Sequence, residues 1–169
     1  MTNNKNLLVA FFVLLGVFTR VIPHPPNMTA IGAIALFSGT FIYDKRLAFV
    51  VPTIIMLISD LLLGYQLVLS VYVSFLIIVS LGFVLSKKHT VMSVVNISIL
   101  ASVIFFVLTN FSVFISSALY SKTFTGLVEC YTLAIPFFLN TLTGNIVYSL
   151  IMFYAFKFVQ NSLSLQHSS

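Results

Sequence analysis

Apolar residues are concentrated in six long runs, and short polar or charged connections separate one run from the next. These runs cover residues 7–22, 28–43, 47–63, 67–85, 91–108 and 131–156. Their lengths come close to the roughly 20 apolar residues that a helix needs to cross a bilayer. We therefore expect an all-α membrane protein whose six transmembrane helices form a single bundle.

Residues 109–130 do not fit this pattern. Their apolar part, 111–119, is too short to span a membrane, because a crossing takes about 20 residues, and a polar stretch follows it. We expect a helical hairpin or an interfacial segment here, so that a partial helical or re-entrant segment lies between the fifth and sixth helices. No second domain is evident, so we divide the chain into one six-helix transmembrane domain, 1–159, and a polar tail, 160–169.

The connection between the first two runs is the most polar part of the chain. Arg20, His24 and Asn27 stand there among three prolines, and apolar chain flanks them on both sides. Proline lacks a backbone N–H and restricts the residue before it, so a regular helix cannot pass through this connection. We predict an elbow that caps one end of the bundle and forms part of the wall of a small polar pocket.

Composition indicates which solvent surrounds the chain. Of the 169 residues, 60% are hydrophobic and only 7% are charged, whereas a soluble domain is about a quarter charged. So few charges cannot cover a water-facing surface, so most of the surface must face lipid. The predicted location is a bacterial plasma (inner) membrane, and the lipid bilayer is the first expected partner.

The net charge of +5 does not indicate nucleic-acid binding, because the basic residues are single or paired between apolar runs. No continuous basic face exists on which phosphates could release counterions. The single cysteine, Cys130, excludes an intrachain disulfide and a CxxC-type zinc site, and no HExxH or Walker A motif occurs. We predict no nucleic-acid partner, no metal and no cofactor.

The distribution of basic residues predicts the orientation. Six crossings place both termini on one side, and most basic residues fall on that side. They are Lys5, Lys45, Arg46, Lys87, Lys88 and Lys157. By the positive-inside rule, both termini are expected in the cytoplasm. A cleaved leader is the alternative for residues 7–22, but Arg20 and the prolines stand where a small-x-small cleavage site would be needed.

Asp60 is the most informative polar residue, because it lies inside the apolar run 47–63. A carboxylate at the bilayer centre costs about 2.5–3.5 kcal/mol on insertion scales, and less near an interface. Something must offset this cost: a partner such as Arg20 or His24, water, or a ligand. The alternative to a ligand role is a helix cap or an ion pair that locks the third helix to the elbow.

Several other polar residues fall near the outer helix ends or recur at helical spacing, and we group them with Asp60 as candidate ligand-binding residues. The set is Arg20, His24, Asn27, Asp60, Asn110, Glu129, Asn140 and Asn145. For each there is a simpler interpretation. Arg20 could extend to the lipid headgroups, His24 and Glu129 could be ordinary loop residues, and the amides could hydrogen-bond neighbouring helices.

Four short patterns carry a family resemblance. They are Arg20-x-x-Pro-His-Pro-Pro-Asn27-x-Thr-Ala-Ile-Gly-Ala, Ser59-Asp60-x-x-x-Gly64, Thr109-Asn110-Phe, and Ile135-Pro-Phe-Phe-x-Asn140-Thr-x-x-Gly-Asn145. Together they resemble an uncharacterised family of small bacterial inner-membrane proteins. That family is in turn similar to the substrate-binding S components of energy-coupling factor (ECF) transporters.

The resemblance implies a six-helix protein that captures a vitamin or similar micronutrient from the outer side. It also implies docking onto a shared energy-coupling membrane module that ATPases drive. S components often carry Ala-x-x-x-Ala on the first helix for docking, but here Leu14 follows Ala10 at that spacing. Ala35 and Gly39 form the small-xxx-small pair that could serve for helix packing or docking instead.

The sequence therefore favours a solute-binding transport subunit that is not an enzyme. One alternative is an assembly or scaffold protein without a ligand. Another is a membrane-embedded enzyme using His24, Asp60 and Glu129 for acid–base chemistry, although no spacing among them demands a metal. Charges of both signs together with several amides favour a neutral or zwitterionic ligand.

Overall fold

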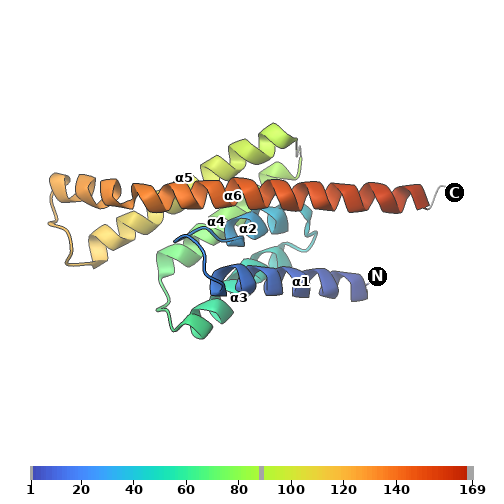
Figure 1. The fold of residues 1–169 in the computed structure, drawn as a ribbon, viewed down its shortest axis with the longest axis horizontal. Coiled ribbons are helices and arrows are strands. Elements are labelled where there is room, and N and C mark those ends of the chain that lie inside the picture. Colours follow the sequence, from blue (N-terminus) through green and yellow to red (C-terminus); the bar gives the residue numbers. More distant parts are fainter. Residues whose placement is uncertain (1, 88–89, 167–169) are drawn as a thin grey trace.

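The computed structural model describes residues 2–87 and 90–166, and it describes side chains for 11–87 and 90–158. Over these residues the chain is helical with no strand, which confirms the predicted all-α class (Figure 1). The helices are α1 (Thr2–Val21), α2 (Ile31–Phe41), α3 (Lys45–Leu63), α4 (Leu69–Leu85), α5 (Val91–Ser116) and α6 (Phe124–Gln166).

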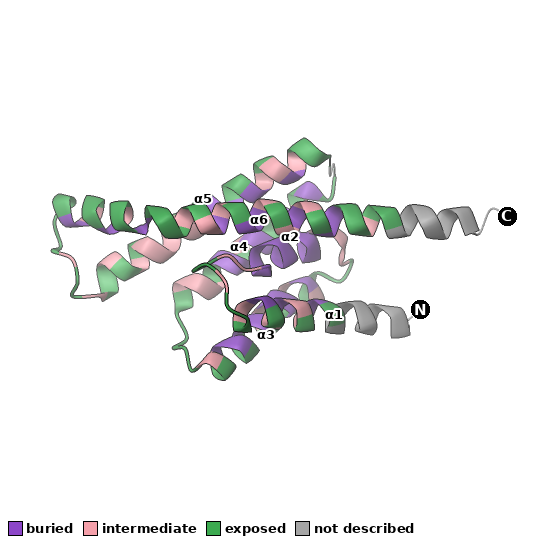
Figure 2. Cartoon of the chain, viewed as in Figure 1, coloured by how far each residue is buried: buried purple, intermediate pink, exposed green. Residues whose placement is uncertain are grey.

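Helix α2 forms the centre of the molecule. Every residue from Ile31 to Gly39 is buried (Figure 2), and α2 contacts all five other helices. It has only 11 residues, or about 16 Å of helix, which is about half of a hydrocarbon core. It is shorter than the run 28–43 because the elbow continues to Ala30 and the helix ends at Phe41.

Small residues let α2 and α4 approach closely. A Cβ on Gly39 would lie 2.1 Å from the backbone oxygen of Val79, and a Cβ on Gly82 would lie 2.4 Å from that of Leu36. Ala35 is fully buried in the same helix. The predicted pair Ala35 and Gly39 therefore packs helices within the chain, where a partner protein cannot reach it.

Side-chain and glycine caps fix the ends of several helices. Asp44 accepts hydrogen bonds from the backbone N–H of Arg46 and begins α3, and Thr90 accepts one from Ser93 and begins α5. Gly64 ends α3 in a left-handed conformation with φ of 68°, which glycine adopts without strain. The pattern Asp60-x-x-x-Gly64 thus marks a helix end.

The segment 109–130 differs from its prediction. The partial helical or re-entrant segment expected there is wrong: α5 continues to Ser116, and α6 already begins at Phe124. Polar residues do not break α5, because Thr109 and Asn110 donate to the carbonyls of Phe105 and Phe106 one turn earlier. The apolar part 111–119 is therefore mostly the last turns of a long helix.

Lys122 stabilises the end of α5. Its Nζ donates to the carbonyl oxygens of Phe114 and Ser117, the latter at 2.6 Å. A cation at a helix C-terminus satisfies otherwise unpaired carbonyls and complements the helix dipole. The polar stretch after α5 is thus a short connection that reverses the chain into α6.

Three of the helical segments among the described residues are long and apolar enough to cross a membrane. They are Lys45–Leu63, Val91–Ser116 and Phe124–Phe158. The other apolar segments are shorter, namely Phe11–Val21, Ile31–Phe41 and Leu69–Leu85. Large apolar side chains such as Leu14, Leu61 and Ile151 are exposed, and extensive apolar exposure of this kind suits contact with lipid. The chain thus has the make-up of a membrane protein, as predicted, with three helices of full spanning length.

Helix α6 runs the whole length of the molecule (Figure 1). Its 43 residues correspond to about 65 Å, roughly twice the hydrocarbon thickness of a bilayer. It continues to Gln166, so the polar tail predicted at 160–169 is helical as far as that residue. Residues 167–169 lie outside the described part of the chain.

The described chain ends, Thr2 and Gln166, lie at one end of the molecule, together with the α2–α3 connection and the adjoining ends of α4 and α5 (Figure 1). Lys45, Arg46 and Lys87 lie in or next to these connections. Lys88 lies outside the described residues, as does the side chain of Lys5. The elbow, 22–30, lies at the opposite end of α1 and α2, as its polar sequence predicts.

Candidate functional site

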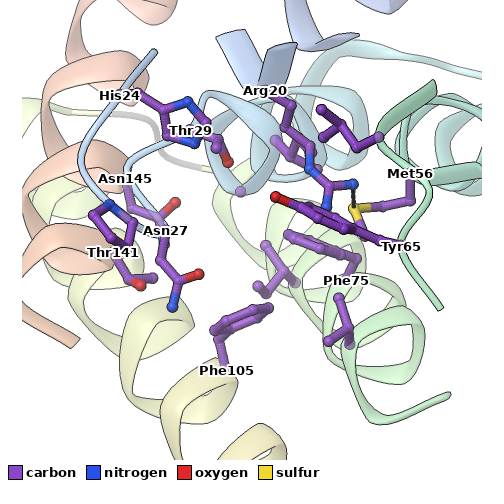
Figure 3. A pocket seen from close by; sticks show the side chains of 16 residues that line it. Arg20, His24, Asn27, Thr29, Met56, Tyr65, Phe75, Phe105, Thr141 and Asn145 are labelled. Atoms are coloured by element: carbon purple, nitrogen blue, oxygen red, sulfur yellow. Dashed lines mark hydrogen bonds between the residues drawn. The ribbon is translucent and has the colours of Figure 1, made fainter. Parts of the chain in front are cut away.

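A cavity of about 390 Å³ lies where the elbow meets the helix bundle (Figure 3). All six helices contribute to its wall. One lining residue from each, in chain order, is Arg20, Ile31, Met56, Phe75, Phe105 and Asn145. Its volume falls in the lower part of the roughly 300–1,000 Å³ range of small-molecule sites. The cavity opens beside the elbow, where Pro26 and Asn27 are exposed.

An ion pair between α1 and α3 supports one side of the cavity. Nη1 of Arg20 lies 2.6 Å from Oδ1 of Asp60, and their side chains are only 14% and 5% exposed. The same nitrogen donates to Oγ of Ser59 at 2.7 Å and to the sulfur of Met56 at 3.3 Å. A buried ion pair is stabilised when hydrogen bonds satisfy its polar atoms, and Ser59 and Met56 do this for Nη1.

Tyr72 completes this group from α4. Its hydroxyl donates to Oδ2 of Asp60 at 2.8 Å, so both carboxylate oxygens are bonded. The guanidinium of Arg20 also lies over the ring of Tyr65, 5.7 Å from the ring centroid, as a cation–π contact requires. Helices α1, α3 and α4 are thereby tied together around one carboxylate. We call Arg20, Ser59, Asp60, Tyr65 and Tyr72 the charged wall.

Uncharged polar groups form the opposite side of the cavity (Figure 3). Asn145 is 4% exposed, and its Nδ2 donates to Oγ of Ser102 on α5 at 2.9 Å. No described residue donates a hydrogen bond to its Oδ1. That oxygen lies against Gly32, where a Cβ would come within 2.1 Å of it. We call Asn27, Thr29, Thr141 and Asn145 the amide wall, because two of its four members are amides.

Hydrogen bonds hold the elbow against the bundle. Nδ2 of Asn140 donates to the carbonyl of Pro26 at 3.0 Å, and Nδ1 of His24 donates to the carbonyl of Ile22 at 2.7 Å. At the base of the elbow, the backbone N–H of Ala30 donates to Oγ1 of Thr19 at 3.3 Å. Asn27 has a positive φ of 67°, which asparagine tolerates better than most residues.

The structure brings six of the eight predicted site residues to this place. Arg20, His24, Asn27 and Asn145 line the cavity, whereas Asp60 lies behind Arg20 and is bonded to it. Asn140 is the sixth, and it holds the elbow through Pro26 without being among the lining residues.

The other two predicted residues lie elsewhere. Asn110 lines a smaller cavity of about 260 Å³ that shares Asn27 and Phe105 with the first, and its amide bonds within its own helix. Glu129 is exposed near the start of α6 and lines none of the cavities found among the described residues.

The predicted site residues leave out most of the residues that line the cavity without an amide side chain. Thr141 lies one helical turn before Asn145, so the sequence places it on the same inward face, but it was not among the predicted site residues. Phe75 and Phe105 gave no signal, because inward aromatic residues look like lipid-facing ones in an apolar run. Tyr72 gave none either, since its partner Asp60 is on another helix.

No group of three or more His, Cys, Asp or Glu side chains comes together among the described residues. The buried thiol of Cys130 contacts the carbonyl of Asn110 at 3.6 Å. The chemistry of the cavity is therefore that of hydrogen bonding, one paired arginine and aromatic contact.

Comparison with protein families gives one match, to a family described as a family of unknown function (DUF6580), over residues 1–166. This chain belongs to the DUF6580 family. No curated protein matches it, and no solved structure does. The DUF6580 match runs through the elbow, all six helices and every residue of the two walls.

Proposed function

We propose that this protein is the substrate-binding subunit of a membrane uptake system and resembles an ECF S component. One observation carries the proposal: a cavity large enough for a small molecule, lined by all six helices, contains the amide of the buried Asn145, whose oxygen has no described donor. Polar groups in lipid-embedded helices are costly, so they usually mark a solute path or a binding site. The ligand would be a small, vitamin-like micronutrient.

In this proposal the six helices form a bundle in a bacterial inner membrane with both termini in the cytoplasm. Lys45, Arg46 and Lys87 lie at the end of the molecule that also carries both described chain ends (Figure 1). This distribution of basic residues supports that orientation. The cavity then opens to the outside at the elbow. Helix α2 does not need to span the membrane itself, because its neighbours surround it.

The bound molecule would be released after docking onto an energy-coupling membrane module with ATPases. Ala35 and Gly39 are buried and cannot provide that contact. Helix α1 presents an exposed apolar face that includes Phe11, Leu14 and Phe18, and we assign docking to this face. Co-purification with such a module, abolished by Leu14→Arg but not by Leu133→Arg on α6, would test this assignment.

Ligand binding itself is tested by thermal unfolding of the purified protein in detergent against a library of water-soluble micronutrients. One compound should raise the unfolding midpoint in wild-type protein, and Asn145→Ala should remove this gain. Asn96→Ala is the matched control, because Asn96 is an exposed amide on α5 far from the cavity lining. If no compound shifts the midpoint, the proposal fails.

A second candidate is an assembly protein without a ligand. It is favoured by the tip of the α5–α6 hairpin, where Ile115, Leu119 and Phe124 are 58%, 80% and 80% exposed. An apolar tip of this kind suits a partner helix or the membrane interface. A stably co-purified subunit together with a library that shifts nothing would favour this candidate.

A further inference from the structure

We infer that the cavity takes an uncharged, flat heteroaromatic molecule whose ring carries amide-type N–H and C=O groups. This inference rests on the proposed function and narrows its ligand class. It follows from three properties of the walls: their charge balance, their spare hydrogen-bonding atoms and their aromatic side chains. Each is taken in turn.

The charge balance argues against a charged guest. Arg20 is the one cationic arginine or lysine among the described lining residues, and Asp60 already pairs with it at 2.6 Å. No Asp or Glu is among the described lining residues, so a cationic guest would meet no counter-charge. An anionic guest would add a second negative charge next to Asp60, which already balances the charge of Arg20. Burying an unpaired charge is far more costly than burying a hydrogen-bonded neutral group.

The amide wall offers neutral hydrogen-bonding groups in a fixed orientation. Because Nδ2 of Asn145 is committed to Ser102, its Oδ1 is available as an acceptor beside the cavity. The side chains of Asn27 and Thr29 also line the cavity and have no hydrogen-bond partner among the described residues. An N–H next to a C=O on a guest matches an amide that both accepts and donates.

The aromatic residues favour a flat guest. Phe75 and Phe105 face the amide wall across the hollow, and Tyr65 lies beside the guanidinium of Arg20 (Figure 3). Aromatic side chains prefer stacked or edge-to-face contact with other rings. A cavity of about 390 Å³ is at the small end for ligand sites, so one or two fused rings suit it better than a long flexible molecule.

Three pools of small molecules, matched in size and differing in charge, test the inference by thermal unfolding. The uncharged pool holds hypoxanthine, lumazine and nicotinamide; the anionic pool holds orotate, nicotinate and quinolinate; the cationic pool holds the 1-methylnicotinamide cation, whose ring nitrogen carries the methyl group. A binder present at 100 times its Kd should raise the midpoint by roughly 5–10 °C. We expect that rise from the uncharged pool alone.

The outcomes separate this inference from the proposed function. A rise with an anionic or cationic compound, and none with an uncharged one, overturns the inference but supports a binding protein. No rise with any pool, or with the wider library, overturns both.

A charge variant gives an independent test. Asn145→Asp adds a carboxylate to the amide wall, and it should abolish the thermal stabilisation by the uncharged binder and favour the 1-methylnicotinamide cation over nicotinamide. Asn96→Asp is the control, because Asn96 is exposed and does not line the cavity. It should leave the wild-type ligand preference unchanged. If Asn145→Asp folds and still prefers the uncharged compound, the amide wall does not determine which ligand binds, and the inference fails. If Asn145→Asp does not fold, Thr29→Ala is a smaller change to the amide wall. It should still reduce the rise in the unfolding midpoint that the uncharged binder causes.

Discussion

The two walls of the cavity are both polar, but they are built in opposite ways. In the charged wall, Nη1 of Arg20 and the Tyr72 hydroxyl donate to the two carboxylate oxygens of Asp60 at 2.6 and 2.8 Å. In the amide wall Asn145 makes one side-chain bond, to Ser102, and keeps an oxygen without a described donor. The charges of the charged wall are therefore already paired, whereas the amide wall offers uncharged hydrogen-bonding atoms to a guest.

This difference separates two reasons for placing polar groups inside an apolar chain. A closed ion-pair network ties α1, α3 and α4 together, and its loss should appear as lost stability. The amides with unused hydrogen-bonding atoms contribute less to folding, and their loss should appear as weaker ligand binding. The predictions below exploit this contrast, from the largest expected effect on stability to the smallest.

Asp60→Ala should cause the largest loss of stability. It leaves the guanidinium of Arg20 part-buried without a counter-charge and removes the acceptor of the Tyr72 hydroxyl. Breaking a buried pair by removing one partner costs about 3–5 kcal/mol. Chemical unfolding in mild detergent would measure it.

Asp44→Ala serves as the control for Asp60→Ala, because it removes only the exposed N-cap of the same helix, worth about 1 kcal/mol. The double variant Arg20→Met with Asp60→Leu should recover most of the loss, since replacing a whole buried pair by apolar residues is often neutral. Equal losses for Asp60→Ala and Asp44→Ala would contradict a closed ion-pair network.

Tyr72→Phe should come next. It deletes the hydroxyl that donates to Oδ2 of Asp60 at 2.8 Å and keeps the ring. Hydrogen bonds to charged groups contribute about 1.5–3 kcal/mol, and thermal unfolding should show a loss in that range. Tyr65→Phe is the matched control, because the hydroxyl of Tyr65 has no bond among the described residues. If Tyr65→Phe loses as much stability as Tyr72→Phe, the loss does not come from the hydrogen bond between Tyr72 and Asp60.

Gly32→Ala tests the amide wall. The added methyl would lie 2.1 Å from Oδ1 of Asn145, so the amide must move and weaken its bond to Ser102. Overpacking of this kind costs about 1–3 kcal/mol. Unlike Tyr72→Phe, this variant should also reduce the thermal gain from any bound ligand.

The comparison for Gly32→Ala is Gly144→Ala, whose nearest contact would be the flexible Met28 side chain at 3.3 Å. Its stability should fall by less, and its ligand response should stay. If the two glycine variants behave alike, the position of the Asn145 amide does not matter for binding.

Glu129→Gln should have the smallest effect. Glu129 is exposed near the start of α6 and belongs to neither wall. Surface substitutions of this kind usually stay within about 0.5 kcal/mol, and unfolding and ligand response should both match wild type. A clear loss of ligand response would mean that the site extends beyond the cavity described above.

The helix pattern was predictable where polar or charged residues end an apolar run. The expected runs 47–63 and 67–85 end where α3 and α4 end and differ from them by two residues at the N-terminal side. Helix α3 begins earlier than expected because Asp44 caps it. The pattern failed at 109–130, where Thr109 and Asn110 look like a break. Their side chains bond to carbonyls of their own helix instead, so the helix continues.

The site was predictable only in part, for a similar reason. Asp60 needed a partner because an unpaired carboxylate in an apolar run is costly, and Arg20 was one of the two partners considered. The sequence could not choose between Arg20 and His24, nor find Tyr72. A contact between residues 40 apart in the chain depends on how two helices are rotated about their axes, and apolar runs without a polar face leave that rotation open.

By itself, the sequence determined the solvent and the secondary structure: so few charges and such long apolar runs require lipid around helices, and the prolines require an elbow. Only the tertiary structure decided which polar groups meet. It buried the 11-residue α2 inside the other helices, paired Arg20 with Asp60, and left Asn145 facing the hollow. The physical reason is that the cost of burying a polar group is local, whereas its relief depends on side chains that packing brings from other helices.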